Sequence, residues 1–284
     1  KILSDFSPDL VIGTGGYVTG TVLKTAIKCG IKTALHESNS LPGVSVKMLA
    51  PKADLVMLGT EDAKKHLGEC KKCVVTGNPL RNNIPIEEKS AARKRLGLPD
   101  CLTILSAGGS QGASRLNEAV VQLLAYEQKK GNINHIHGYG KHGRDTFMQS
   151  LKDNGVDAEN PHFIIKEYID NMYTCMCASD LIITRAGAMT LTEIMAIGRA
   201  SVLIPYPYAA ENHQYYNALT LQNANAGRII DDKELTGSVL IDTVNRLADD
   251  PELLRLMSEN AAKLSKHDAA GIILREITEL MGIK

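Results

Sequence analysis

The sequence has no tryptophan, and aromatic residues make up only 4% of its 284 positions. Neither sign of charge dominates, because 32 Lys and Arg residues balance 32 Asp and Glu residues. Proteins that bind nucleic acid use a basic surface or aromatic rings that stack on bases. The composition therefore argues against a nucleic-acid partner, while leaving room for a local basic or apolar patch.

Long apolar runs and a cysteine framework are also missing. No apolar run approaches the roughly 20 residues that cross a bilayer as a helix, so we expect the chain to lie at most on a membrane surface. Six cysteines in a chain of this size indicate reduced thiols rather than a disulfide scaffold. The CxxC pair of Cys70 and Cys73 has no second pair to complete a four-sulfur zinc site, so we expect no metal there.

Short apolar runs alternate with amphipathic segments along the rest of the chain. This pattern predicts an α/β fold with parallel sheets, and the length predicts about two domains. The break is expected within 77–100, which is rich in Pro, Asn and charge, and only helices are expected after residue 235. The expected strands are 9–13, 32–36, 54–58, 102–107, 133–138, 162–166, 180–184 and 201–205, and the expected helices include 114–129, 235–249, 251–265 and 268–281.

Glycine-containing turns follow three of these strands, at the position where an open parallel sheet binds its ligands. They are 13–17 (GTGGY), 108–113 (GGSQGA) and 184–190 (TRAGAMT). Glycine lets the backbone approach a phosphate, and the following helix presents free N–H groups to the anion. Each turn alone is equally compatible with ordinary packing. No turn is followed by GKS or GKT, and GGSQGA does not match GxGxxG, which counts against an ATPase and a dehydrogenase.

Polar residues after the third turn suit the hydroxyls of a nucleotide sugar. Glu193 is expected one helical turn beyond it, where a carboxylate can accept hydrogen bonds from both hydroxyls of a ribose. The alternative is a solvated glutamate on the helix face. Residues 211–214 (ENHQ) open a further helix with groups that pair with sugar hydroxyls, or that simply cap the helix.

Two pairs that contain histidine are candidates for acid–base or ligand chemistry. His36 and Glu37 end the strand at 32–36, where they either perform acid–base chemistry or close a loop by hydrogen bonds. His135 and His137 are expected to point to opposite faces of their strand or to straddle its end, and we assign them no metal.

Taken together, these segments resemble the MurG family of UDP-N-acetylglucosamine transferases, which convert lipid I to lipid II in peptidoglycan synthesis and so serve cell-wall biogenesis, cell shape and cell division. The matching stretches are collinear and span nearly the whole chain. They are GTGGYVTG (13–20), HESN (36–39), GNPLR (77–81), GGSQGASRLN (108–117), YID (168–170), TRAGAMTLTEI (184–194) and ENHQYYNA (211–218). The resemblance implies a GT-B fold, in which two Rossmann-like domains with parallel sheets face a cleft, the N-terminal one being incomplete. It also implies an inverting hexosyltransferase that uses neither metal nor cofactor.

The resemblance also assigns roles to particular residues. Residues 1–81 would be a partial acceptor-binding domain, on which a helix at about 266–284 packs back, and residues 82–265 would bind the UDP-sugar. The backbone of Ile169 would bind uracil, Glu193 the ribose and Ser110 the diphosphate. Further donor contacts would come from Asn39, Arg81, Gln214 and the turn of Ala188, Met189, Thr190, Leu191 and Thr192. The turn of Gly13, Thr14, Gly15, Gly16 and Tyr17 would face the diphosphate of the lipid acceptor, and His36 or Glu37 would be the general base.

The implied partners are UDP-N-acetylglucosamine, undecaprenyl-linked lipid I and the membrane, at the cytoplasmic face of the bacterial plasma membrane. Two departures from the family pattern stand out: Ser38 replaces the usual glutamine, and an opening GGTGGH loop with a candidate base is not in the sequence. We therefore expect a truncated chain that binds donor but is impaired in transfer. The alternatives are a nucleotide-sugar-binding module that needs a separate acceptor-binding chain, and another GT-B enzyme such as a UDP-sugar epimerase.

Overall fold

The computed structural model describes residues 2–81, 84 and 86–283, which form two compact units. The first unit consists of the stretch that ends at Arg81, the segment Tyr208–Thr220 and the stretch that begins at Ser265. The second consists of the remaining stretches, which end at Pro207 and Leu264. The segment Tyr208–Thr220 therefore departs from the expectation of one domain over 82–265. The reason is a set of hydrogen bonds, described below, to loops of the first unit.

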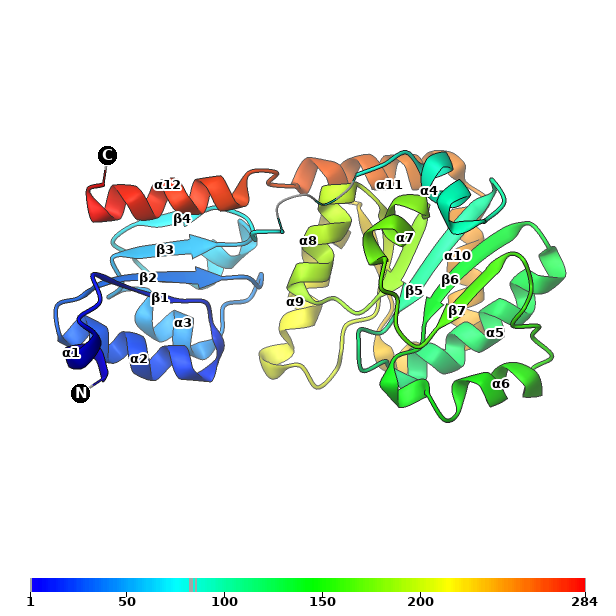
Figure 1. Cartoon of the computed structure of the whole chain (residues 1–284), viewed down its shortest axis with the longest axis horizontal. Coiled ribbons are helices and arrows are strands. Elements are labelled where there is room, and N and C mark those ends of the chain that lie inside the picture. Colours follow the sequence, from blue (N-terminus) through cyan, green and yellow to red (C-terminus); the bar gives the residue numbers. More distant parts are fainter. Residues whose placement is uncertain (1, 82–83, 85, 284) are drawn as a thin grey trace. The chain divides into compact units, whose positions relative to one another are not determined.

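The first unit is a parallel sheet with helices on both faces (Figure 1). One face carries a cluster with Leu35 and Val56, and the other carries a cluster with Ala34 and Met57, on which Ile277 packs. Strands covered on both faces read as continuous apolar runs, which is why the sequence pattern identifies them. The strand order is β1 (Leu10–Gly13), β2 (Lys32–Glu37), β3 (Leu55–Leu58) and β4 (Cys73–Val75). The helices and helical turns are α1 (Ile2–Phe6), α2 (Gly16–Lys28), α3 (Val44–Leu49), η1 (Asp62–His66), η3 (Ala210–Asn212), α9 (His213–Asn223, which ends in the second unit) and α12 (Ala269–Met281).

The second unit is also a parallel sheet, and its strand order reverses in the middle. The order is β10 (Gly227–Ile229), β9 (Ala200–Leu203), β8 (Leu181–Thr184), β5 (Leu102–Ala107), β6 (Ile133–Gly138) and β7 (Phe163–Lys166). The helices and helical turns are α4 (Lys89–Leu96), α5 (Ser114–Lys130), η2 (Lys141–Gly143), α6 (Phe147–Asp153), α7 (Met172–Ala178), α8 (Ala188–Ile197), η4 (Asp232–Glu234), α10 (Gly237–Ala248) and α11 (Pro251–Leu264). Each strand-to-helix connection therefore leaves the sheet at the same edge.

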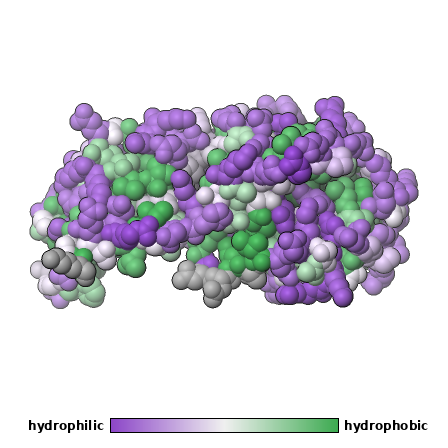
Figure 2. Space-filling model, turned by 90° about the horizontal axis from the view of Figure 1, so that it is seen from above, coloured by the Kyte–Doolittle hydropathy of each residue, from purple (hydrophilic) through white to green (hydrophobic). Residues whose placement is uncertain are grey.

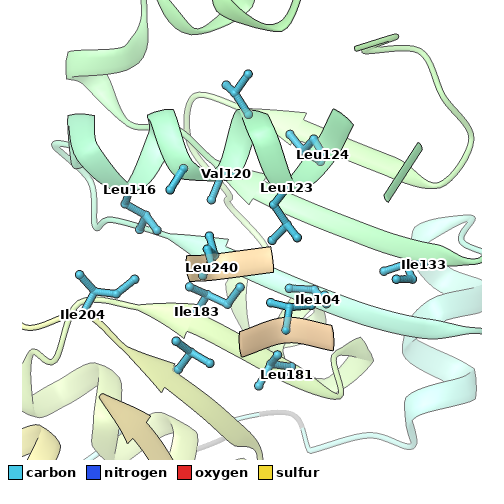
Figure 3. Close-up of a cluster of buried hydrophobic side chains, with 14 of the residues drawn as sticks. Ile104, Leu116, Val120, Leu123, Leu124, Ile133, Leu181, Ile183, Ile204 and Leu240 are labelled. Carbon is cyan, nitrogen blue, oxygen red and sulfur yellow. The ribbon is translucent and has the colours of Figure 1, made fainter. Parts of the chain in front are cut away.

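The core of the second unit lies between α5, α10 and the sheet (Figure 3). Leu116 and Leu123 of α5 point toward Ile104 and Ile183 of the strands, and Leu240 of α10 completes the layer. Full burial of a side chain of this size contributes about 1.5–3 kcal/mol. This core fixes the direction in which β5 enters α5, and so the position of the turn between them.

All eight predicted strands are present, and the four predicted helices begin and end within two residues of their expected bounds. The strands β4 and β10, of three residues each, were not predicted because such short apolar runs carry no periodicity. The expectation for His135 and His137 was wrong. Residues two apart in a strand share a face, and both rings lie within hydrogen-bond distance of Ser106.

Among the described residues, no helix has the length and apolar character needed to cross a membrane. In the view of Figure 2, hydrophilic residues cover much of the surface, and apolar patches lie between them. Exposed apolar side chains do gather on two helices of the first unit, α2 and α3, where Tyr17, Val18, Val44 and Met48 are more than half exposed.

Candidate functional site

The strand order of the second unit places a switch point between β5 and β8. From β5 the sheet continues through β6 and β7 on one side, and from β8 it continues through β9 and β10 on the other. Open α/β sheets bind ligands beyond the carboxyl ends of their strands at such a point. The turns that leave these two central strands are 108–113 and 185–187, and both belong to glycine-containing motifs.

The turn 108–113 is tightly built from backbone alone. Gly112 N donates to Gly109 O over 2.9 Å. A Cβ atom on Gly112 (φ +84°) would lie 2.3 Å from Tyr139 O, so no larger residue fits there. Helix α5 follows with no side-chain cap at Ala113, and Ser110 is exposed at the tip. The N–H groups of the first turn of α5 are therefore left for an anion, each favourable charge being worth about 0.3–2 kcal/mol.

The turn 185–187 ends in a second helix without a side-chain cap, α8, whose N-cap residue is Gly187. Of the five residues predicted to bind donor here, Ala188 and Thr190 are half-buried and Met189 is 43% exposed. Leu191 is instead buried in the core, and the Thr192 hydroxyl donates to Ala188 O over 2.8 Å. The first turn of α8 therefore offers backbone rather than side-chain groups to a ligand.

Arg185 holds this second turn in place. Its Nη1 lies 2.6 Å from Asp232 Oδ1 and donates to Ile204 O over 3.2 Å. The guanidinium also lies 5.7 Å from the centre of the Tyr206 ring. Arg185 thus ties the turn after β8 to the loop after β9 and to η4. Arg185 lies within the 184–194 motif, but the sequence pattern predicts no role for its side chain.

Glu193 lies one turn into α8 and is half-buried. Its Oε1 accepts a hydrogen bond from Tyr173 Oη of α7 over 2.9 Å. The side chain of Ile169 is buried after β7, where its Cδ1 would lie 3.2 Å from a Cβ built on Gly138, so only its backbone is left to meet a ligand. The carboxyl edge of the second unit thus carries Ser110, Ile169, the start of α8 and Glu193.

The turn 13–17 of the first unit leaves β1 and enters α2. Gly13 is buried against Leu23 and Leu35, where a Cβ would lie 2.7 Å and 3.3 Å from their side chains. Gly15 and Gly16 have φ values of +88° and +78°, with open space where a Cβ would be. Thr14 and Tyr17 are exposed, and α2 has no side-chain cap. The turn therefore offers backbone N–H groups, as the turns of the second unit do.

His36 and Glu37 are both buried and hydrogen-bonded to the chain's own loops. His36 Nε2 lies 3.1 Å from Gly77 O, and burial lowers the pKa of this imidazole. Because a carbonyl only accepts, His36 must carry its proton on Nε2 here. Glu37 Oε1 accepts from Asn39 N and Nδ2 over 2.9 and 3.0 Å, and Oε2 accepts from Gly43 N over 3.0 Å. Glu37 therefore holds the loop 37–43 in shape.

Asn39 connects this loop to α9. Its Oδ1 accepts from Asn217 Nδ2 over 3.0 Å, while Asn217 Oδ1 accepts from Ser40 N over 2.8 Å. Thr220 donates to Asp62 Oδ2 over 2.8 Å. These contacts explain why Tyr208–Thr220 groups with the first unit.

The entry to α9 is strained. Glu211 and Asn212 have φ values of +51° and +56°, a region that non-glycine residues rarely occupy and that costs about 1–3 kcal/mol each. Gln214 follows in the first turn of α9 and is half-buried. Asn217 was not predicted as a site residue, although it lies one turn beyond Gln214 in the same ENHQYYNA stretch.

The structure therefore divides the predicted residues between two units. The second unit holds those predicted to bind uracil, ribose and diphosphate, while the first holds His36, Glu37, Asn39, Gln214 and the 13–17 turn. Arg81 is the last residue of the first of this unit's three stretches, and its side chain is exposed. Nowhere in the described chain do three His, Cys, Asp or Glu side chains gather in a way that could hold a metal ion.

Two parallel sheets, with a switch point flanked by helices that lack side-chain caps, define an α/β protein of the class to which GT-B glycosyltransferases belong. Residues 103–273 match the "Glycosyltransferase family 28 C-terminal domain" and residues 1–58 match the "Glycosyltransferase family 28 N-terminal domain". The chain belongs to glycosyltransferase family 28, and within it to the MurG group.

Two curated relatives carry the name UDP-N-acetylglucosamine–N-acetylmuramyl-(pentapeptide) pyrophosphoryl-undecaprenol N-acetylglucosamine transferase. The protein of Desulforamulus reducens is 39% identical over 282 residues, which are 99% of this chain and 76% of that protein. That of Desulfitobacterium hafniense is 41% identical over 276 residues, which are 97% of this chain and 75% of that protein. These similarities confirm the resemblance that the motifs indicated.

Solved structures agree on the fold. MurG of Acinetobacter baumannii matches with a TM-score of 0.80 and 27% identity, covering 98% of this chain and 75% of that chain. UDP-GlcNAc 2-epimerase of Neisseria meningitidis matches with a TM-score of 0.64 and 16% identity, covering 98% and 78%. The second likeness concerns the fold alone. The predicted GT-B class is confirmed.

Proposed function

We propose that this protein transfers N-acetylglucosamine from UDP-N-acetylglucosamine to the C4 hydroxyl of lipid I, forming lipid II with inversion at the anomeric carbon. The relatives named above support the reaction, since their names state this donor and this class of acceptor. The single observation that carries the donor site is the pair of uncapped helices, α5 and α8, at the switch point between β5 and β8.

In this proposal the second unit binds the donor and stabilises the leaving group. Negative charge develops on the β-phosphate as the glycosidic bond breaks, and fixed N–H groups at helix N-termini stabilise that charge without a metal. Ser110 and residues 188–190 contact the diphosphate. Glu193 accepts both ribose hydroxyls, and the backbone at Ile169 pairs with uracil.

The first unit binds the acceptor. The 13–17 turn contacts the acceptor diphosphate through backbone N–H groups, which a helix N-terminus makes favourable for anions. Asn39 and Gln214 contact the sugar of the donor. Arg81 is a further donor contact, through its positive charge. Glu37 acts as a positioning residue for Asn39, because both its oxygens are used by the 37–43 loop.

His36 is the proposed acceptor of the C4 hydroxyl proton. Its lowered pKa keeps the imidazole neutral at neutral pH, and with Nε2 donating to Gly77 O the lone pair lies on Nδ1. A neutral imidazole with an unprotonated ring nitrogen is the form that can take a proton.

The same unit offers a surface for the membrane that contains lipid I. Tyr17, Val18 and Val22 of α2 are exposed beside Val44 and Met48 of α3, and the two helices are packed together. Lys24 and Lys28 of α2 add positive charge suited to anionic lipid, whereas Lys47 of α3 is paired with Glu211 at 3.5 Å. We place the protein at the cytoplasmic face of the plasma membrane as a peripheral protein.

The test is calorimetric titration with UDP-N-acetylglucosamine in the presence of EDTA, followed by incubation with lipid I and labelled donor. We expect binding that EDTA does not change, and label in lipid II. Gly112→Ala should weaken donor binding at least tenfold, because its Cβ would meet Tyr139 O. Gly131→Ala is the matched control, since Gly131 also has positive φ (+69°) but open space around it, at the opposite end of α5. Absence of donor binding in the unaltered protein would refute the proposal.

The alternatives make different predictions in the same experiment. A donor-binding module that needs a separate acceptor chain would bind UDP-N-acetylglucosamine without labelling lipid I. A UDP-sugar epimerase would convert the donor when no acceptor is present.

A further inference from the structure

Four polar side chains form a connected chain inside the second unit, and the proposed transfer uses none of them. Ser106 Oγ lies 2.7 Å from His135 Nε2 and 2.7 Å from His137 Nδ1. His135 Nδ1 lies 2.7 Å from Glu127 Oε2. Ser106 and both histidines are fully buried, and Glu127 is 1% exposed. We call these four residues the Ser106 chain.

The Ser106 hydroxyl is the central link of the chain. It has one proton, so it donates to one imidazole and accepts from the other. Its removal would leave a buried N–H and a buried lone pair unpaired together, which is costly inside a protein. His137 Nε2 and Glu127 Oε1 already lack partners among the described residues, so the ends of the chain have no alternative contact at hand. Burial also lowers the pKa of His137 well below its ordinary value, which keeps this ring neutral.

The Ser106 chain lies next to the turn 108–113, which follows β5, and to the turn 139–140, which joins β6 to η2. Ser106 and His137 are paired in register on β5 and β6, and each is followed by one more strand residue before its turn begins. The two turns are in contact, since His142 N donates to Gln111 O over 2.8 Å, and Asn117 Nδ2 donates to Tyr139 O over 2.9 Å. The distance between the ends of β5 and β6 therefore decides how the two turns meet.

We propose that Ser106 and His137 are positioning residues for the donor diphosphate: their hydrogen bond holds the ends of β5 and β6 at the separation that shapes the 108–113 turn. This inference rests on the proposed function, in which that turn contacts the diphosphate. It adds that the affinity for the diphosphate depends on Ser106 and His137, two fully buried side chains that do not contact the ligand.

The experiment compares UDP with uridine, which lacks the diphosphate. In calorimetric titrations of the full chain, Ser106→Ala should weaken UDP binding about tenfold and leave uridine binding within about twofold. His137→Phe should show the same selective loss, and the double variant should bind UDP no more weakly than the weaker single variant, because the two residues act as a unit. Ser201→Ala is the matched control: Ser201 is also fully buried, on β9, where its hydroxyl donates to Ala226 O over 3.4 Å. It should change neither affinity.

Three outcomes separate the possibilities. Equal weakening of UDP and uridine by Ser106→Ala, or equal effects of Ser106→Ala and Ser201→Ala, would overturn the inference in favour of a merely stabilising role. Failure of the unaltered protein to bind UDP at all would instead refute the proposed function.

A second measurement needs no variant and applies even if the variants do not fold. The ring ¹⁵N resonances of His135 and His137 should shift when UDP is added and stay in place when uridine is added. Unchanged resonances with bound UDP would overturn the inference.

Discussion

Replacement of Glu193 by alanine is the most direct test of how the ribose is bound. In the structure the carboxylate lies half-buried on α8 and already accepts a hydrogen bond from Tyr173 Oη over 2.9 Å. Two ribose hydroxyls would each add a hydrogen bond to a charged group, worth about 1.5–3 kcal/mol in a sheltered site. Water competes at a half-buried carboxylate, so we expect a total loss of about 1–3 kcal/mol, or a 5- to 150-fold rise in the Kd for UDP.

The assay is calorimetry with UDP and with 2′,3′-dideoxyuridine diphosphate. Glu193→Ala should weaken UDP binding but leave binding of the dideoxy analogue unchanged, because the analogue lacks the hydroxyls that Glu193 accepts. Glu193→Gln should fall between, since it keeps one acceptor oxygen and loses the charge.

Tyr173→Phe serves as the control, because it removes the phenol that orients Glu193 and leaves the carboxylate in place. We expect a loss of UDP affinity of about 1 kcal/mol or less from this variant. If Glu193→Ala binds UDP as the unaltered protein does, or weakens both nucleotides equally, the ribose assignment is wrong.

Three further predictions concern stability and the membrane. Arg185→Met should lower the free energy of unfolding in urea by about 2 kcal/mol, because the mostly buried Asp232 then keeps only the longer ion pair with Arg115, at 3.9 Å; an unchanged urea midpoint would show that the Arg185–Asp232 pair is not needed to hold the turns. Burial lowers the pKa of His36 below its ordinary 6.5, so its contribution to stability is present above pH 6.5 and is lost as the pH falls toward the folded-state value. Urea midpoints at pH 7.5 and 5.5 should therefore differ more in the unaltered protein than in His36→Phe. Val18→Glu on α2 should reduce sedimentation with vesicles of anionic phospholipid severalfold, while Val239→Glu, at an exposed position of α10 in the second unit, should not; equal loss from both would argue against a membrane surface on α2.

Most strands could be predicted from the sequence because they are buried on both faces of their sheet. Strands such as Leu55–Leu58 are buried on both faces, so their residues form continuous apolar runs that stand out from amphipathic helices. The location of Tyr208–Thr220 was not predictable in this way. It depends on hydrogen bonds such as that between Asn39 and Asn217, and residues 178 positions apart leave no local pattern.

The parts of the candidate site that could be predicted are the glycine-containing turns that follow strands. Glycines after strands identified the turns 13–17, 108–113 and 184–190, and in the first two the backbone requires glycine, because Gly15, Gly16, Gly109 and Gly112 have positive φ. Tyr173 and Arg185 were not predicted, because they act by holding Glu193 and Asp232 in place. Their local sequence carries no signal for these contacts. The partnership of His135 with His137 was missed for a different reason, a misassigned strand face.

The chain passes between its two compact units four times: after Arg81, after Pro207, after Thr220 and after Leu264. This connectivity limits how relatives with different donor preferences can be recombined. A chimaera with one junction near Arg81 would combine the Asn39 loop of one parent with the Asn217 helix of the other. The hydrogen bonds between the loop and the helix would then join residues from two different parents. Exchange at all four passages would keep the Asn39 loop with Asn217, and α12 with its sheet. It would also divide α9 after Thr220 and leave Asn39 and Gln214, the proposed contacts to the donor sugar, with the first unit.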